Sequence, residues 1–103
     1  MSNSVITTDE ALGLPHPGEV LRSEFMEPMG LSAYALAKAM GVSRSRINDI
    51  AHGRQGITAA IALRLGRYFN VDPQWFMNMQ SKFDLSRAQK TVDVSGISPR
   101  HAA

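Results

Sequence analysis

The side chains best suited to bind a ligand lie close together, between residues 44 and 55. An arginine can form two hydrogen bonds with guanine, an asparagine can do the same with adenine, and a serine is short enough for close approach to a base or a phosphate. We therefore predict that DNA bases are read by four residues: Arg44, Ser45, Arg46 and Asn48. A phosphate contact stays open for each arginine, because half or more of protein–DNA hydrogen bonds go to the backbone.

These side chains need a helix that presents them, and the spacing of residues 31–53 predicts one. Ala37 is small where two helices would cross, and Gly41, four residues later, can take the positive φ of a sharp turn. Ile47 and Ile50 would then turn the second helix toward the core. This is the pattern of a helix-turn-helix, whose second helix enters the DNA major groove. A bundle helix with no binding role can also be amphipathic, but it less often combines this spacing with two arginines at its start.

Other polar residues around this unit are predicted to bind phosphate. Serines at the two helix starts can cap them, where backbone N–H groups suit phosphate oxygens. Tyr34 could instead pack in the core, although we favour the surface. The predicted phosphate contacts are Ser32, Tyr34, Lys38, Ser43, Arg54 and Gln55.

The distribution of charge supports a nucleic-acid partner. The net charge of the 103 residues is only +2, but residues 1–31 carry −4 and residues 32–67 carry +5. The basic segment coincides with the predicted helix-turn-helix, and such a field attracts phosphate and speeds association. A solubilising surface is the alternative for an ordinary basic stretch; its overlap with the motif favours binding.

Five helices are predicted, which makes the fold all-α. They span about residues 18–26, 33–40, 44–52, 59–69 and 73–88, with Asp72-Pro73 as a clear helix start. Trp75 is expected to pack in the core against the fourth helix. Residues 1–14 are predicted to form a flexible arm, residues 15–89 the folded domain, and residues 90–103 a flexible tail.

Several classes of function are not supported by the sequence. The chain has no cysteine, and His16, His52 and His101 are scattered, so we expect no metal site and no cofactor. The spacing of the residues does not predict a group of catalytic side chains, and we predict that the protein is not an enzyme. The N-terminal residues lack a basic region followed by an apolar run, and no stretch approaches the length of a membrane span. We therefore expect a soluble, cytoplasmic protein with no membrane partner.

The run from His16 to about Ala88, roughly seven-tenths of the chain, resembles the HigA-type antitoxins, also called VapI-like. They are a branch of the lambda-repressor-like, or Xre, helix-turn-helix proteins. Three blocks carry the resemblance: HPGE from His16, LSAYALAKAMGVSRSRINDIAHGRQGIT from Leu31, and ALRLGRYFNVDPQWFMNMQSKFDL from Ala62. The last block is the most specific, since ordinary Xre domains do not share it.

The resemblance implies a dimeric repressor that binds a palindromic operator and neutralises a small, RelE-like, mRNA-cleaving toxin. It also places the four base-reading candidates in the family's DNA-reading stretch, and a dimer contact in the last block. The residues implied for that contact are Phe76, Met79, Gln80, Phe83 and Leu85. Many relatives have glutamine where this chain has Ala33, so one phosphate contact of the family is expected to be missing.

Two other readings stay open at this point. A stand-alone repressor would have the same DNA chemistry without a toxin, and only the resemblance favours the antitoxin over it. A protein-interaction module that has lost DNA binding would not need clustered arginines, and Arg44 with Arg46 argue against it.

Overall fold

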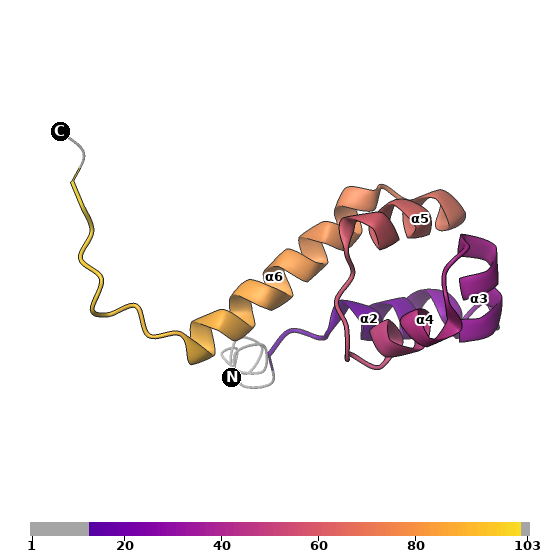
Figure 1. Ribbon diagram of the computed structural model, residues 1–103, viewed down its shortest axis with the longest axis horizontal. Coiled ribbons are helices and arrows are strands. Elements are labelled where there is room, and N and C mark those ends of the chain that lie inside the picture. Colours follow the sequence, from indigo (N-terminus) through magenta and orange to yellow (C-terminus); the bar gives the residue numbers. More distant parts are fainter. Residues whose placement is uncertain (1–12, 102–103) are drawn as a thin grey trace, which may run out of the picture.

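The computed structural model describes residues 13–101, and all the regular secondary structure in them is helical (Figure 1). The first helix is α2 (Pro17–Val20), which continues directly into η1 (Leu21–Met26). It is followed by α3 (Ala33–Met40), α4 (Arg44–Ala51), α5 (Ala59–Phe69) and α6 (Pro73–Thr91). The five predicted helices are confirmed, the first as α2 and η1 together. No helix in the described part of the chain is long and apolar enough to span a membrane. The predicted N-terminal arm, residues 1–14, falls outside the described residues except for its last two.

Local capping explains where most of these helices begin. Ser32, Ser43 and Thr58 each accept a hydrogen bond from the backbone N–H three residues later, and Asp72 accepts one from Gln74 N. Each bond satisfies a donor that a helix start leaves without an intrahelical partner. The end of α5 is equally local, because Asn70 takes the left-handed conformation with φ 58°.

The first helix widens into a π-helical segment that the sequence analysis did not predict. Within η1 the backbone hydrogen bonds reach one residue farther than in an α-helix, as the bond from Glu27 N to Arg22 O shows at 2.9 Å. The same spacing allows an exposed ion pair between Arg22 Nη1 and Glu27 Oε2, 3.0 Å apart. Phe25 lies between them in sequence and packs against Phe69, with ring centres 4.8 Å apart.

One hydrophobic core joins η1 and helices α3 to α6. Leu21 of η1, Leu36 of α3, Ile50 of α4, Leu65 of α5 and Phe76 of α6 have no exposed surface. Helix α3 packs mainly on α4, and α5 on α6, so the core lies between these two pairs. The α4 helix, which carries the predicted DNA-reading residues, is therefore fixed by its apolar side.

Helix α6 differs from the prediction in two ways. It runs to Thr91 rather than to about Ala88, so the segment without helix begins at Val92 instead of Lys90. Its C-terminal half extends beyond the other helices (Figure 1). Trp75, which we expected in the core against α5, is 42% exposed, and its ring forms a T-shaped pair with that of Phe25 of η1. That prediction was wrong because the buried aromatic position of this turn is taken by the next residue, Phe76.

Candidate nucleic-acid interface

The start of α4 presents the predicted base-reading residues on the side away from the core. Ser43 Oγ accepts from Arg46 N over 3.1 Å and so fixes where the helix begins. Arg44 and Ser45 are exposed, and Asn48 is half-buried. Because Ile47 has no exposed surface, the helix cannot rotate without opening the core. Arg44 and Ser45 are therefore the more accessible candidates for a base contact.

Arg46 has a more restricted position than Arg44. Its Nη2 lies 3.5 Å from Thr58 Oγ1 at the start of α5, and its Nε is buried with no hydrogen-bond partner in the described part of the chain. A buried donor without an acceptor is costly, at about 1–3 kcal/mol. The terminal guanidinium nitrogens are thus the part of Arg46 that a nucleic acid could reach.

The turn between α3 and α4 has the predicted conformation, and one residue that was not predicted, Arg64, bonds to it. Gly41 has φ 72°, and Val42 N donates to Ala37 O over 3.0 Å, which closes the end of α3. Arg64 Nη1 of α5 donates to the Met40 carbonyl oxygen over 2.7 Å. This bond was not predicted, because nothing in the spacing of Arg64 distinguishes it from a solvated charge. Arg64 therefore stabilises the turn as well as adding charge near it.

The segment that follows α4 is organised around Asp49. Arg54 Nε donates to Asp49 Oδ1 over 2.9 Å, and Gln55 Nε2 lies 3.5 Å from Asp49 Oδ2. The backbone N–H of Arg54 also donates to Asp49 O, over 2.8 Å. Both predicted phosphate contacts are thus held beside the C-terminal half of α4. At the same end, His52 Nδ1 lies 2.8 Å from Asn48 O, which requires the proton on that nitrogen.

The remaining phosphate candidates lie on the surface around α3 and the start of α4. Ser32 and Ser43 are exposed and are used as caps, so their helix starts are fixed. Tyr34 is 60% exposed, as expected, and Lys38 Nζ is 6.0 Å from the centre of its ring. Lys38 and Tyr34 thus form one exposed pair on α3.

The residues predicted for a dimer contact fall into two groups, one buried within the subunit and one accessible. Phe76 has no exposed surface and Gln80 is 9% exposed, so both pack inside the subunit rather than against a second copy. Met79 and Phe83 are half-buried, and Leu85 is 60% exposed on the projecting half of α6. These last three stay the candidates for contact with a second copy.

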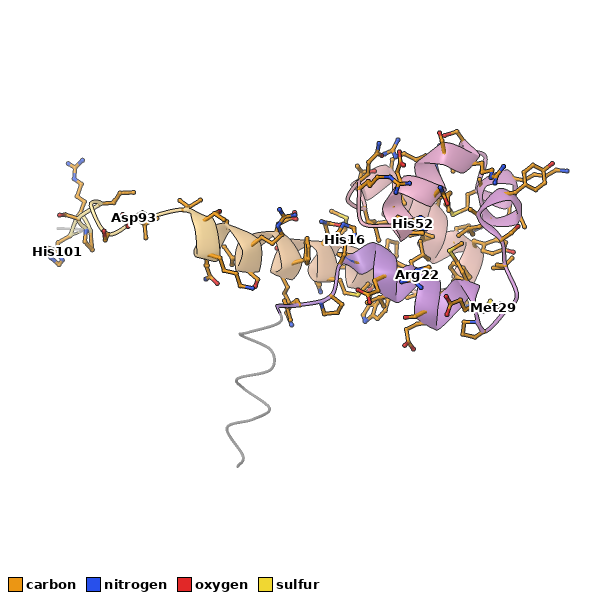
Figure 2. The ribbon with its side chains drawn as sticks, turned by 90° about the horizontal axis from the view of Figure 1, so that it is seen from below. His16, Arg22, Met29, His52, Asp93 and His101 are labelled. Atoms are coloured by element: carbon orange, nitrogen blue, oxygen red, sulfur yellow. The ribbon has the colours of Figure 1, made fainter. Side chains whose placement is uncertain are left out.

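His16 joins the first helix to α6. Its Nδ1 accepts a hydrogen bond from Gly18 N over 2.8 Å and so caps α2. Its ring meets Phe83 of α6 edge-on, 4.9 Å between centres, where α6 leaves the bundle (Figure 2). Burial lowers the pKa of His16; the charge of Asp84 opposes this shift and that of Arg87 adds to it. The neutral ring therefore keeps the lone pair that the cap needs.

In the described residues, no group of three histidine, cysteine or acidic side chains could hold a metal ion. The site consists of side chains that can form hydrogen bonds and ion pairs on one surface. It begins at α3, continues along the exposed side of α4 and ends in the segment that Asp49 holds.

Similarity to known proteins shows the family to which this chain belongs. The helix-turn-helix family model HTH_3 matches residues 23–76, more than half of the chain, and the chain belongs to this family. Virulence-associated protein I of Dichelobacter nodosus is 59% identical over 75 residues, which cover 73% of this chain and 69% of that protein.

Solved structures agree with this assignment. Pseudomonas aeruginosa antitoxin HigA, solved with the higBA promoter, is 41% identical with a TM-score of 0.75, and the match covers 84% of this chain and 98% of that one. Antitoxin GraA, solved in complex with its operator, is 41% identical with a TM-score of 0.79, over 86% and 92% of the two chains. The protein is thus a helix-turn-helix protein related to the VapI and HigA antitoxins, a family that is not one of enzymes. The predicted fold class and the resemblance are confirmed.

Proposed function

We propose that this protein is the antitoxin of a toxin–antitoxin pair and represses its own operon by binding a palindromic operator. The observation that carries the DNA-binding half of the proposal is the start of α4, where Arg44 and Ser45 are exposed and Ile47 is fully buried. The antitoxin half is supported by the similarity to HigA. Two relatives with this fold, HigA and GraA, were solved with promoter or operator DNA. The proposed place of action is the cytoplasm, where that DNA lies.

In this proposal α4 enters the major groove and the surrounding residues bind the backbone. Arg44 and the terminal nitrogens of Arg46 would read guanine, Asn48 would read adenine, and Ser45 would approach a base or phosphate. The phosphate contacts would come from the residues that flank α4: Ser32, Tyr34, Lys38, Ser43, Arg54 and Gln55.

We propose that the DNA-binding form is a homodimer. One recognition helix covers too little DNA for operator-level specificity, whereas a two-fold dimer would place two of them about 34 Å apart. The projecting half of α6 supports this, because it leaves the apolar side chain of Leu85 60% exposed. A palindromic operator would match the two-fold symmetry of the dimer.

The DNA half of the proposal is tested by removing the two arginines together. For Arg44→Ala with Arg46→Ala, we expect the preference for the promoter of its own gene over mixed-sequence DNA to fall at least about tenfold, since one bidentate base contact contributes about 1–3 kcal/mol. Residual binding at low salt should survive. The control, Lys90→Ala with Arg100→Ala, removes the same charge from exposed positions beyond the interface and should keep the preference. Equal losses on both DNAs would show that the arginines contact only phosphate.

The toxin half concerns a small RelE-like toxin encoded beside this gene. Cells that express the neighbouring small reading frame alone should stop growing, and co-expression of this chain should restore growth. A harmless neighbour, or no rescue, would favour the alternative function of a stand-alone repressor. The exposed arginine at the start of α4 supports that alternative equally, because it concerns DNA alone.

A further inference from the structure

Gln80 of α6 is buried although it is polar, and both ends of its amide are bonded. It is 9% exposed and is the one buried polar side chain in residues 13–101. Its Oε1 accepts a hydrogen bond from Ile57 N over 2.7 Å, and its Nε2 donates to Asp84 Oδ1 over 2.9 Å. Because the amide has one accepting and one donating end, these two bonds fix its orientation.

The bond to Ile57 ties down the segment that links α4 to α5. This segment, residues 52–58, contains Arg54 and Gln55. Near its start it is held to α4, because Arg54 bonds to Asp49 through both its backbone N–H and its side chain. Near its end it is held to α6 by Gln80. Two helices therefore determine where the segment lies.

The space between Gln80 and this segment is also filled. A Cβ atom added to Gly56 would lie 2.9 Å from Gln80 Nε2 and 3.0 Å from its amide carbon. The amide therefore packs directly on the backbone of residue 56 in addition to its bond with the next residue. Without that amide, the N–H of Ile57 would lack a buried acceptor, and the segment would have to move to reach water.

We propose that Gln80 is a positioning residue for DNA binding: through Ile57 it holds the segment that carries Arg54 and Gln55 in place against α4. Gln80 does not touch DNA itself, because it is buried and lies on α6. The inference rests on the proposed function, and specifically on binding through the helix-turn-helix. It assigns to the centre of α6 a role in phosphate binding that is separate from any contact with a second copy.

Three changes separate this role from simple packing. Gln80→Met keeps a side chain of similar length but removes the acceptor for Ile57 N. Gly56→Ala acts from the other side, because its Cβ would displace the amide. The double change Gln80→Glu with Asp84→Asn reverses donor and acceptor between the two side chains. It keeps an oxygen for Ile57 N and the same net charge, so it should restore what Gln80→Met loses.

The assay is a double-mutant cycle with Arg54→Ala, using the full chain and a labelled mixed-sequence duplex of about 20 base pairs, long enough for two half-sites. In the wild-type background, Arg54→Ala should lower the slope of log affinity against log salt by about 1. In the Gln80→Met background that slope should already be reduced, and Arg54→Ala should change affinity by less than about twofold, because coupled residues are not additive. The swapped pair should regain the full effect of Arg54→Ala.

Additive effects of Gln80→Met and Arg54→Ala, with the salt slope unchanged by Gln80→Met, would overturn the inference and leave Gln80 as a packing residue. Circular dichroism would establish that each variant is folded, and Gly56→Ala would take the place of Gln80→Met in the cycle if the latter does not fold. Wild-type protein that showed no salt-dependent binding to the duplex would instead overturn the proposed DNA binding itself. The two failures are thereby distinguishable.

Discussion

Gly18 is the position at which a single methyl group should do the most damage. A Cβ atom there would lie 1.6 Å from the Ile50 carbonyl oxygen and 2.5 Å from its carbon, both backbone atoms of α4. Since a comfortable carbon–oxygen contact is about 3.3–3.6 Å, Gly18→Ala requires the first helix and α4 to separate by about 2 Å. Neither neighbour is a flexible side-chain end, so no rotamer change can relieve the clash.

The expected change in the free energy of unfolding is the sum of two opposing effects. Overpacking a well-packed core costs about 1–3 kcal/mol and occasionally more. Alanine in place of glycine in a helix stabilises the folded state by at most about 1 kcal/mol, which offsets part of this cost. The separation would also loosen Leu21 and Pro17, which are fully buried in the same helix. We therefore expect the free energy of unfolding to fall by about 1–2 kcal/mol, or roughly 5–15 °C in melting temperature.

The measurement is thermal and urea unfolding followed by circular dichroism. Gly96→Ala is the matched control, because a Cβ there would meet nothing within 4 Å. Its stability should stay within about 0.5 kcal/mol of the wild type. An unchanged or raised melting temperature for Gly18→Ala would refute the close approach of α2 and α4.

Two further predictions concern His16 and the aromatic pair of α6. Because burial lowers the pKa of His16, the unfolded chain takes up a proton at higher pH than the folded chain does. Melting temperature should therefore fall as pH drops below about 6.5, and His16→Asn, which keeps a capping acceptor, should flatten this dependence; an identical pH profile would contradict it. Phe76→Ala should cost about 3–5 kcal/mol in urea unfolding because Phe76 is fully buried, whereas Trp75→Ala, at a position 42% exposed, should cost distinctly less. Equal costs would place Trp75 in the core after all.

The parts of the fold that were predicted from sequence depend on neighbours in the chain. A capping serine, a proline after Asp72, or a glycine with positive φ acts within one helical turn, so its effect is visible in the sequence. The helix starts at Ser32 and Ser43 and the turn at Gly41 were predicted for this reason. The exposed position of Arg44 is also predictable from the sequence, because Ile47 and Ile50 determine which side of α4 faces the core.

The parts that were missed depend on distances between helices. Gln80 and Leu85 both lie on α6, but Gln80 packs against Gly56 and Ile57 and is buried, whereas Leu85 is 60% exposed. Arg64 and Arg67 read alike in sequence, but only Arg64 reaches the carbonyl of Met40. Spacing alone therefore does not predict which polar side chains would contact DNA and which hold other residues in place.

Insertions and deletions should act on the first helix in a way that differs from the other helices. A π-helical turn accommodates one residue more than an α-helical turn does, so η1 holds a residue that a regular helix would not need. Removal of one residue before Phe25 would turn the following side chains by about 100°, the angle of one helical position. Conversion of the π-helical turn to a regular one could absorb that change and keep Phe25 against Phe69. This segment can thus lose an exposed residue while Phe25 keeps its contact with Phe69, a tolerance to length change that the evenly wound α3, α4 and α5 do not share.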